Sequence, residues 1–502
     1  MTKLANMKTK IVLCAIMLLV PHLVFSIETI SIKKFGAKGD GKTNDHIAFQ
    51  QAAEYINRAG HDVTLVIPFG IYIVGNQVPG QEWLLNGDDL IFLKDCRSIE
   101  IVGEPKNGKY PKLRYKDGLY FGSFEGNPLK GKLKPKCVPD KDYYNRKTCA
   151  FIGNCFTLLN CSKVKISSIE IDGNQNGMVL GGNYGDRGKQ LNHRGFYLAN
   201  SANISLSNIY VHHMGLDGVE VTGCEKTTIK NLISTYNGRQ GLSWTAGNGL
   251  EISDSKFNYS GNSRICSSPG AGMDIEPESK ANITHGVFNN CEFMYNAGCG
   301  LVNDRNSYLA VDMVFKGCTF LGHDSWAIWA RGTRFRFENC KIYGHCTNLV
   351  LSADVKSPED ITLFEKCVFS NVYKGALTKP LSPFLLDFNS IKVRMNNCSI
   401  SSYGIGFLWH SNNDGRPGLE SSISNTTIMT NNVSNSHASV NGMQFENCTV
   451  LYTEKVSINL GVAVNKNSKV QSLSREIMNQ KMKAGFLRPH INTIKPYICT
   501  EK

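Results

Sequence analysis

The sequence predicts an all-β protein, a right-handed parallel β-helix with a small N-terminal helix cap and a C-terminal cap. Two kinds of short strand alternate along the chain at a nearly constant spacing, which is typical of a solenoid rather than a sandwich. Strands of the first kind have a small residue and then apolar residues in alternation, the pattern of a strand with one buried face. They are expected at Gly195–Leu198, Gly218–Val221, Gly241–Trp244, Gly272–Ile275, Gly300–Asn303 and Ala327–Ala330.

The second kind of strand sets the length of each coil. Its inward-facing position falls at Ile169, Ile209, Leu232, Ser255, Cys291, Cys318, Cys340, Cys367, Cys398, Thr426 and Cys448. Most steps resemble the 22 residues from Cys318 to Cys340, which is one turn of a parallel β-helix. Two longer steps contain the insertions Gly173–His193 and Asn258–Pro269. Both precede a strand of the first kind, so we expect them to wall a groove on one flank.

The cysteines on this inward position are interpreted as stacked, reduced thiols that fill the core as small apolar groups. No CxxC spacing occurs, so the sequence does not predict a zinc site of that type. Four cysteines outside the ladder are the better disulfide candidates in an exported chain, namely Cys137, Cys149, Cys155 and Cys161.

The chain is expected to begin with a secretory signal peptide at residues 1–26. Lysines precede the apolar run Ile11–Val20, and Val24–Ser26 supplies a cleavage site. No later apolar run is long enough to span a bilayer. The mature protein is therefore expected to be secreted or periplasmic, without a membrane span.

Residues 27–160 are expected to form the N-terminal cap and the first coils. Thr43, Asn44 or Asp45 can cap a helix that Gly60 ends, and its apolar face consists of Phe49, Ala52, Ala53 and Ile56. Strands are predicted at Val63–Ile67 and Ile71–Val74. The basic insertion Leu129–Lys147 is either a solvated loop or an arm that contacts an anionic chain. Residues 161–464 are the predicted catalytic β-helix, and residues 465–502 the C-terminal cap.

One stretch of the chain resembles a known family. The segment FGAKGDGKTNDHIAFQQA, followed by VTLVIPFGIYIVG, is similar to the N-terminal cap of the pectate-lyase-like superfamily, which includes the family 28 polygalacturonases. The match covers about residues 30–75, and the coil repeats extend it to about residue 460. The resemblance implies a right-handed parallel β-helix and activity on a polysaccharide. It does not fix the reaction, because one fold hosts many chemistries.

The chemistry is expected on the outward face of the first kind of strand, between the two inward apolar positions. One outward column reads Tyr197, Glu220, Ser243, Asp274, Val302 and Trp329, and the next reads Ala199, Thr222, Thr245, Glu276, Asp304 and Arg331. From these columns and the turns before them we predict the catalytic residues Asp217, Glu220, Arg239, Asp274, Glu276 and His213. The predicted substrate-binding residues are Arg194, Gln240, Asp304, Arg305, Trp329 and Arg331.

Two reactions fit this face. Carboxylates one or two coils apart, at about 4.8 Å per coil, approach the separation of about 6.5–9.5 Å that an inverting hydrolase needs. A lyase instead needs a base, for which His212 or His213 is available, and arginines that neutralise a uronate carboxylate. Calcium held by Asp274, Glu276 and Asp304 is a possible cofactor for this role; the pattern requires none, and the metal ligands stay open.

The sequence departs from the polygalacturonase pattern, since it contains no GHG or RIK motif and the DD position reads Gly298-Cys299-Gly300. With a net charge of +13, we expect an acidic polysaccharide substrate, pectin-like or glycosaminoglycan-like, and no nucleic acid partner. β-Elimination by a polysaccharide lyase is placed first and hydrolysis close behind. A non-catalytic, carbohydrate-binding β-helix is the remaining alternative. The protein is expected to be a monomer.

Overall fold

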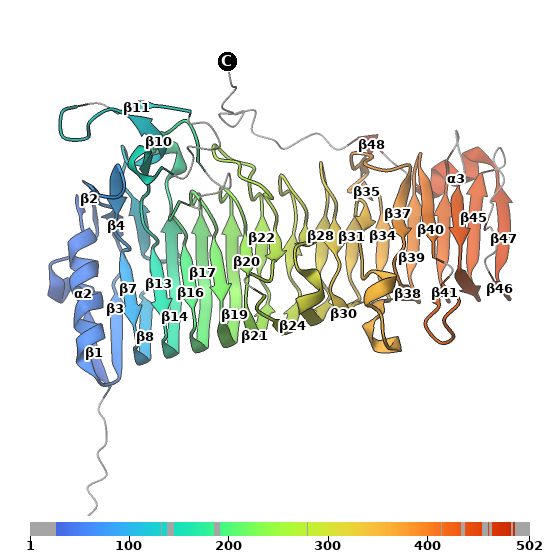
Figure 1. Ribbon diagram of the computed structural model, residues 1–502, viewed down its shortest axis with the longest axis horizontal. Helices are drawn as coiled ribbons and strands as arrows, with labels where there is room; N and C mark the ends of the chain where they lie inside the picture. Colours follow the sequence, from blue (N-terminus) through green and yellow to red (C-terminus); the bar gives the residue numbers. More distant parts are fainter. Residues whose placement is uncertain are drawn as a thin grey trace, which may run out of the picture.

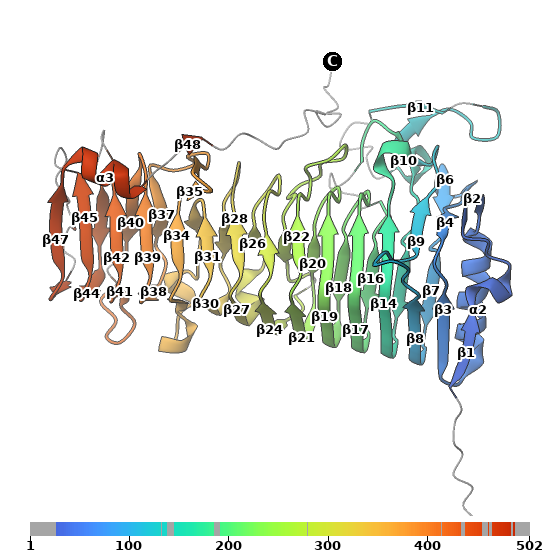
Figure 2. The same ribbon diagram turned by 180° about the vertical axis from the view of Figure 1, so that it is seen from behind.

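The computed structural model describes residues 27–131, 133–137, 145–184, 191–278, 280–412, 414–432, 437–453, 460, 464–482 and 485–486. The described residues form one long solenoid, in which successive coils stack side by side from the N-terminal to the C-terminal end (Figures 1 and 2). The predicted signal peptide, and Lys132 and residues 138–144 of the basic insertion, lie outside the described residues. No helix among the described residues is long and apolar enough to cross a membrane.

Helix α2 (His46–Ala59) covers the N-terminal end of the solenoid, as the sequence predicts (Figure 1). Its apolar face is buried, and it packs against β7 (Ile91–Lys94). Asp45 occupies the N-cap position, but its carboxylate accepts hydrogen bonds from the backbone N–H groups of Lys38 and Gly39 at 2.6 and 2.9 Å. Gly60 ends the helix with a positive φ of 64°.

One sheet of the solenoid is a 12-stranded parallel sheet that contains the first kind of strand. Its strands are β7, β13 (Phe156–Leu159), β16 (Phe196–Ala199), β18 (Val219–Thr222), β20 (Leu242–Trp244), β23 (Met273–Ile275), β26 (Leu301–Asn303), β29 (Ile328–Ala330), β32 (Cys346–Thr347), β37 (Phe384–Asn389), β40 (Gly406–Ser411) and β43 (Ala438–Asn441). Its register pairs Tyr197 with Glu220, Glu220 with Ser243, and Ser243 with Asp274. The predicted outward column is therefore confirmed.

The second large sheet has 27 strands and holds the second kind of strand. Its first strands are β1 (Glu28–Ser31), β2 (Asp40–Asn44), β3 (Val63–Ile67), β4 (Ile71–Val74), β8 (Arg97–Gly103), β9 (Lys112–Tyr115), β14 (Ser162–Asp172), β17 (Ala202–His212) and β19 (Cys224–Thr235). Each later coil contributes a pair of shorter strands: β21 (Gly247–Ser253) and β22 (Lys256–Asn258), β24 (Ile283–Asn289) and β25 (Glu292–Phe293), β27 (Ala310–Lys316) and β28 (Thr319–Leu321), β30 (Thr333–Glu338) and β31 (Lys341–Tyr343), β33 (Thr362–Glu365) and β34 (Val368–Ser370), β38 (Val393–Asn396) and β39 (Ser399–Ser402), β41 (Ser421–Ser424) and β42 (Thr427–Thr430), β44 (Met443–Glu446) and β45 (Thr449–Thr453), β46 (Val464–Lys466) and β47 (Lys469–Leu473).

Further short strands and a helix lie outside the two large sheets. A six-stranded sheet lies near the N-terminal end and contains β5 (Gln77–Pro79), β6 (Leu85–Gly87), β10 (Tyr120–Glu125), β11 (Lys134–Pro135), β12 (Cys149–Ala150) and β15 (Val179–Leu180). A three-stranded sheet joins β35 (Val372–Tyr373), β36 (Ala376–Leu377) and β48 (Gly485–Phe486). Near the C-terminal end, α3 (Arg475–Met482) follows β47, in the region where the sequence predicts a C-terminal cap.

The predicted insertions contact each other. Arg264 Nη1, from the second insertion, donates hydrogen bonds to three carbonyls of the first, those of Gln175, Asn176 and Met178, at 2.8–3.1 Å. Ser263 Oγ donates to Gln175 Oε1 at 2.7 Å. These contacts join the two insertions along one flank of the solenoid.

The core is built from ladders of like residues. The rings of Phe288, Phe315, Phe337 and Phe364 stack at 4.5–5.0 Å between successive centroids. The predicted cysteine rung lies beside them and is confirmed, since all its cysteines are buried and outside disulfides. Each thiol faces a backbone carbonyl of the preceding coil, as when Cys340 Sγ donates to the Phe315 carbonyl at 3.3 Å.

Three of the four predicted disulfide candidates are thiols instead. Cys149, Cys155 and Cys161 are buried and form no disulfide, whereas Cys137 is disulfide-bonded. The reason is that all three lie in the main apolar core, where a thiol fills space as a small apolar group, as on the main rung. Cys161 Sγ, for example, donates to the Leu93 carbonyl at 3.4 Å.

The rung predicts a modest stability cost when a thiol is removed. Cys340→Ala should lower the free energy of unfolding by about 1–3 kcal/mol, because the sulfur leaves a small cavity in a packed ladder. Urea denaturation measures this cost, and Cys266→Ala, at a partly exposed position, is the control with a smaller effect. Thiol counting on denatured, unreduced protein should find the six rung cysteines free, and pairing among them would contradict the structure.

Candidate functional site

Charged side chains converge on the outer face of the 12-stranded sheet, over β16, β18, β20 and β23. Some lie on the strands, and others lie in the turn just before a strand. These turns are tight because glycine opens each strand. A Cβ at Gly218 would lie 2.0 Å from Ser234 Oγ, and one at Gly241 would lie 2.6 Å from the Gly272 carbonyl oxygen. Only glycine therefore lets the preceding turn lie so close to the next coil.

We call this group the carboxylate–arginine cluster, and its members are Arg194, Asp217, Glu220, Arg239, Gln240, Asp274 and Glu276. Arg194 comes first in the chain, and its Nε donates a hydrogen bond to Glu220 Oε2 on the next coil. Arg194 Nε also lies 4.0 Å from Asp217 Oδ2. The Arg194 guanidinium packs over the ring of Tyr197, 5.2 Å from its centroid.

Arg239 and Gln240 connect the remaining carboxylates across the coils. Arg239 lies 3.6 Å from Asp217 Oδ2 and 3.7 Å from Glu276 Oε2. The backbone N–H of Gln240 donates to Asp217 Oδ1 at 3.0 Å, and its side-chain Nε2 donates to Asp274 Oδ2 at 2.6 Å. One network therefore links the carboxylates of two coils, those of β18 and β23, through Arg239 and Gln240 on the coil between them.

The cluster is buried, although the sequence analysis expects exposed surface positions. The exposed fraction is 0% for Asp217, 2% for Arg239 and 3% for Asp274. The correction has a physical reason: at the spacing of adjacent coils, long side chains on one column pack against one another and exclude water. An alanine substitution here would leave a buried partner unpaired, so it should lower the free energy of unfolding.

Burial shifts the acidity of two carboxyl groups. It raises the pKa of Asp274 well above its usual value, and the nearby negative charge of Glu276 raises it further, against the effect of Arg239. Burial also raises the pKa of Asp217 to about 6, while Arg239 opposes this shift. Burial thus favours the protonated form of Asp274, which is the form that a general acid needs.

The other predicted substrate-binding residues lie at the edge of the cluster or beyond it. Arg305 is exposed and lies 3.4 Å from Glu276 Oε1, and Asp304 beside it is exposed. Trp329 and Arg331 are partly buried. The Trp329 ring packs edge-on against Trp326 at 4.5 Å, beside Val302. These tryptophans form an apolar surface along the same outward column.

His213 lies in a different group from the cluster. Its ring contacts His212 and stacks on Tyr236. In the part of the chain that the structure describes, no hydrogen bond or ion pair joins His213 to the carboxylate–arginine cluster. The predicted role of His213 as a base at that cluster therefore gains no support from its position.

A calcium ion does not fit Asp274, Glu276 and Asp304 well. The Asp274 carboxylate already accepts from Gln240, and the Glu276 carboxylate faces two guanidinium groups. Among the described residues, the group whose ligand atoms all lie within 4.8 Å of one another is Asp172, His212 and His213. The position of a metal, if one is bound, is therefore elsewhere in the fold.

The sequence analysis missed an acidic group two coils before Arg194, in the turn that leads into β7. Asp89 accepts hydrogen bonds from Thr157 Oγ1 at 2.6 Å and from the backbone of Asn154 at 2.7 Å. Asn154 Oδ1 in turn accepts from the backbone N–H of Arg194 at 3.1 Å. The signal was available: Thr157 stands directly beside Tyr197 in the register, so the outward column begins one coil earlier.

The comparisons with known proteins agree on the fold. The family model described as "Right handed beta helix region" matches residues 154–342. The chain is a right-handed parallel β-helix protein. This fold is the one that the resemblance to the pectate-lyase-like superfamily implies. A comparison with curated protein sequences finds no match.

Solved structures of other β-helix proteins resemble the chain at low sequence identity. The A-module of mannuronan C-5 epimerase AlgE6 from Azotobacter vinelandii aligns with a TM-score of 0.50 at 14% identity, over 88% of this chain and 99% of that one. An exopolygalacturonase from Thermotoga maritima gives 0.37 at 11% identity, over 88% and 93%. The catalytic domain of a GH87 α-1,3-glucanase gives 0.41 at 11%, over 90% and 66%. At these identities the similarity shows the fold alone.

The buried pair of Arg194 and Glu220 predicts a large stability effect. Glu220→Ala should lower the free energy of unfolding by about 3 kcal/mol or more, because it leaves the buried guanidinium without its carboxylate. The double variant Arg194→Met/Glu220→Leu should recover most of that loss in urea denaturation. Glu338→Ala, whose carboxylate is partly exposed opposite Lys316, is the control. Equal costs for Glu220→Ala and Glu338→Ala would contradict the burial of the pair.

The raised pKa of Asp217 predicts a pH dependence of stability. An unfolded aspartate titrates near about 3.9, whereas folded Asp217 titrates at about 6. The stabilising contribution of protonated Asp217 to the free energy of unfolding is therefore fully present below pH 4. It is lost as the pH rises through 6. The free energy of unfolding of the wild type, minus that of Asp217→Asn, should fall across this range. Denaturation at several pH values measures the difference, and a rise would rule out the raised pKa.

Proposed function

We propose that this protein is an enzyme that cleaves an acidic, uronate-containing polysaccharide at the carboxylate–arginine cluster. The observation that carries the proposal is the burial of several charged groups on the outer face of a solenoid whose core does not need them. Buried ion pairs add little net stability. Carboxyl groups with strongly shifted pKa values instead gather at functional sites.

The contacts of the cluster favour hydrolysis as the reaction. A hydrolase needs a protonated carboxyl group that donates to the leaving oxygen and a carboxylate that activates water. Asp274, with its raised pKa, fits the first role, and the more exposed Glu276 fits the second. The two stand two residues apart on one strand, at a side-chain separation of roughly 6–7 Å, which is the short end of the range for inversion.

Elimination is the second candidate, and one observation favours it. The Arg305 side chain is 71% exposed at the edge of the cluster, where its guanidinium can pair with a uronate carboxylate. The other two arginines are less suited to this role, because Arg194 and Arg239 already face carboxylates of the protein. We therefore rank hydrolysis above elimination, although composition and arginine content alone favour elimination.

Charge and aromatic surface support the acidic polysaccharide as substrate. The chain carries a net charge of +13, and a basic protein attracts polyanions. Trp326 and Trp329 extend the outward column with an apolar surface on which a sugar ring can pack. The β-helix protein with a TM-score of 0.50 is a mannuronan C-5 epimerase. Secretion after cleavage near residue 26 and a monomeric state belong to the same proposal.

A screen of the purified protein on pectin, alginate and glycosaminoglycans tests the proposal. An increase in reducing ends without new absorbance at about 232–235 nm indicates hydrolysis, whereas an increase in both signals indicates elimination. Binding of a polysaccharide without either signal would mean that the protein is a carbohydrate-binding β-helix, and the proposed enzyme function would then fail.

Asp274→Asn should lower kcat/KM by about 10²-fold or more, because the amide cannot donate the proton to the leaving group. Steady-state kinetics on the substrate found in the screen measure the loss, and the near-isosteric amide keeps the fold comparable with the wild type. Arg239→Ala should give a loss of similar size through the charge it balances. Glu338→Ala, on the other sheet, should keep full activity. An active Asp274→Asn variant would remove Asp274 from the catalytic role.

A further inference from the structure

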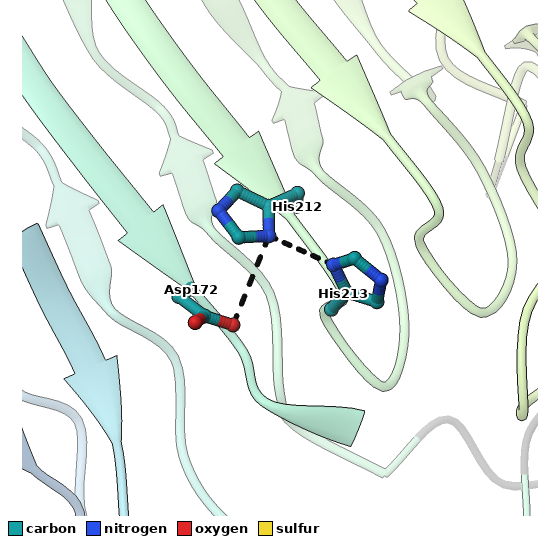
Figure 3. Close-up of side chains that lie close together, drawn as sticks. All are labelled: Asp172, His212 and His213. Carbon is teal, nitrogen blue, oxygen red and sulfur yellow. Dashed lines mark hydrogen bonds and ion pairs between the residues drawn. The ribbon is translucent and has the colours of Figure 1, made fainter. Parts of the chain in front are cut away.

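Two histidines and an aspartate meet at the end of β17, away from the carboxylate–arginine cluster (Figure 3). The parallel register brings them together, because Arg114, Asp172 and His212 stand side by side on three successive coils. Two residues earlier on the same strands, Lys112, Glu170 and Tyr210 form the neighbouring column. Residues two apart on a strand share one face, so both columns face outward together.

The ligand atoms of the three residues point toward one another (Figure 3). His212 Nδ1 lies 2.8 Å from His213 Nδ1 and 3.7 Å from Asp172 Oδ1. Successive residues of a strand would point to opposite faces. His213 escapes this alternation because its backbone has a positive φ of 54°, which turns its ring to the same side as His212. The same positive φ recurs at Tyr236, Tyr259 and Tyr295, whose rings continue the stack from His213 on the next coils, so this backbone conformation belongs to the repeated turn of the solenoid.

A second layer of contacts fixes the orientation of the rings. His212 Nε2 lies 3.2 Å from Glu170 Oε1, and the same oxygen lies 2.7 Å from Lys112 Nζ. Glu170 Oε1 therefore accepts a hydrogen bond from the Nε2–H group of His212. The Nδ1 lone pair of His212 is then directed at His213 and Asp172. A carboxylate that accepts from the outer nitrogen of a histidine is the usual support of a metal ligand.

The rest of the surroundings hold the remaining groups in place. Arg114 Nε lies 3.6 Å from Asp172 Oδ2, and Asp172 Oδ1 accepts a hydrogen bond from the backbone N–H of Asn174 at 2.9 Å while it faces His212. The ring of Tyr210 lies against His212, at 4.3 Å between centroids, and Tyr236 stacks on His213 at 5.3 Å. His212 is buried, whereas Asp172 and His213 are partly exposed. An ion can therefore enter from solvent and keep water on its open positions.

We propose that Asp172, His212 and His213 bind a divalent transition metal ion of the kind that imidazole and carboxylate hold together, with zinc as the representative ion. Two imidazole nitrogens and one carboxylate form a recurrent ligand set for such ions. Calcium and magnesium prefer oxygen ligands alone and do not fit. A metal–nitrogen distance of about 2.0–2.1 Å needs only a small movement of the rings from their present spacing.

The position of the site gives the ion a structural consequence. The turn that starts at His212 and His213 runs directly into Asp217 of the carboxylate–arginine cluster. An ion held by β14 and by this turn ties two neighbouring coils together at the point where the chain enters β18. Metal binding does not depend on the proposed polysaccharide activity, and the two proposals stand or fall separately.

Zinc binding to the full-length protein tests the site. Protein treated with EDTA and dialysed should bind one equivalent of zinc chloride in isothermal titration calorimetry, with a micromolar or tighter Kd. Its thermal midpoint should rise with zinc, because an ion that binds only the folded state stabilises it. The absence of saturable binding, or the same midpoint with and without zinc, would overturn the proposal.

Variants locate the binding. His213→Asn and Asp172→Asn should each abolish the zinc-dependent rise in midpoint, and Glu170→Gln should weaken binding by about 10–100-fold through the lost support of His212. The control is His285→Ala, because His285 is exposed and faces a single carboxylate, that of Asp312, at 3.7 Å. This variant should bind zinc like the wild type. One equivalent of zinc that remains bound to His213→Asn would place the ion elsewhere.

A measurement on the wild type covers the case in which a variant fails to fold. The X-ray absorption spectrum of the zinc-loaded protein should show imidazole scattering from two histidines and light oxygen or nitrogen neighbours only. Sulfur neighbours, or a spectrum without imidazole scattering, would contradict the assignment to these residues. Both readouts are independent of enzymatic activity, so a failure of the proposed function would leave them unchanged.

Discussion

The stacking of each coil in register on the next is the constraint on which the rest of the structure depends. Parallel strands of neighbouring coils lie about 4.8 Å apart, so a residue meets its equivalent one coil away. The pairing of Glu220 with Ser243, and of Ser243 with Asp274, follows from it on the outside. The phenylalanine and cysteine ladders follow from it on the inside. A single slip in register would break all of these columns together.

The same constraint brings charges together that must then be neutralised locally. Ionised groups at this spacing and depth are costly unless each has a partner of opposite charge or a hydrogen bond. Arg194 and Arg239 supply the charges, and Gln240 supplies donors to two carboxyl groups at once. Asp274 accepts a hydrogen bond from the Gln240 amide, and burial raises its pKa well above the usual value. The environment of Asp274 thus differs from that of the carboxylates that face the arginines.

The repeat made most of the fold predictable from the sequence. The strands, the helix that Gly60 ends, and the reduced cysteine rung follow from period-two patterns and coil spacing alone, because these depend on local apolar positions. The depth of the outward column did not follow, since the burial of Asp217 depends on how long side chains of three coils fill the space between them. The thiols Cys149, Cys155 and Cys161 were misjudged because the repeat is irregular there.

The group of Asp172, His212 and His213 was predictable only in part. Its members come from two coils separated by the insertion Gly173–His193, but the inward positions Ile169 and Ile209 already place Asp172 beside His212. The contact of His213 did not follow, because its left-handed backbone breaks the alternation on which the pattern analysis relies.

The small sheet of β35, β36 and β48 affects how the solenoid comes apart. In a solenoid each coil contacts only its neighbours, so the last coils can peel away one at a time. Here β48, which follows the final coils in the chain, pairs in parallel with β36 several coils back. The pairing of β48 with β36 therefore links a segment that follows the last coils to a part of the chain that precedes them. Separation of the last coils must first break this pairing, so we expect these coils to unfold together rather than one at a time.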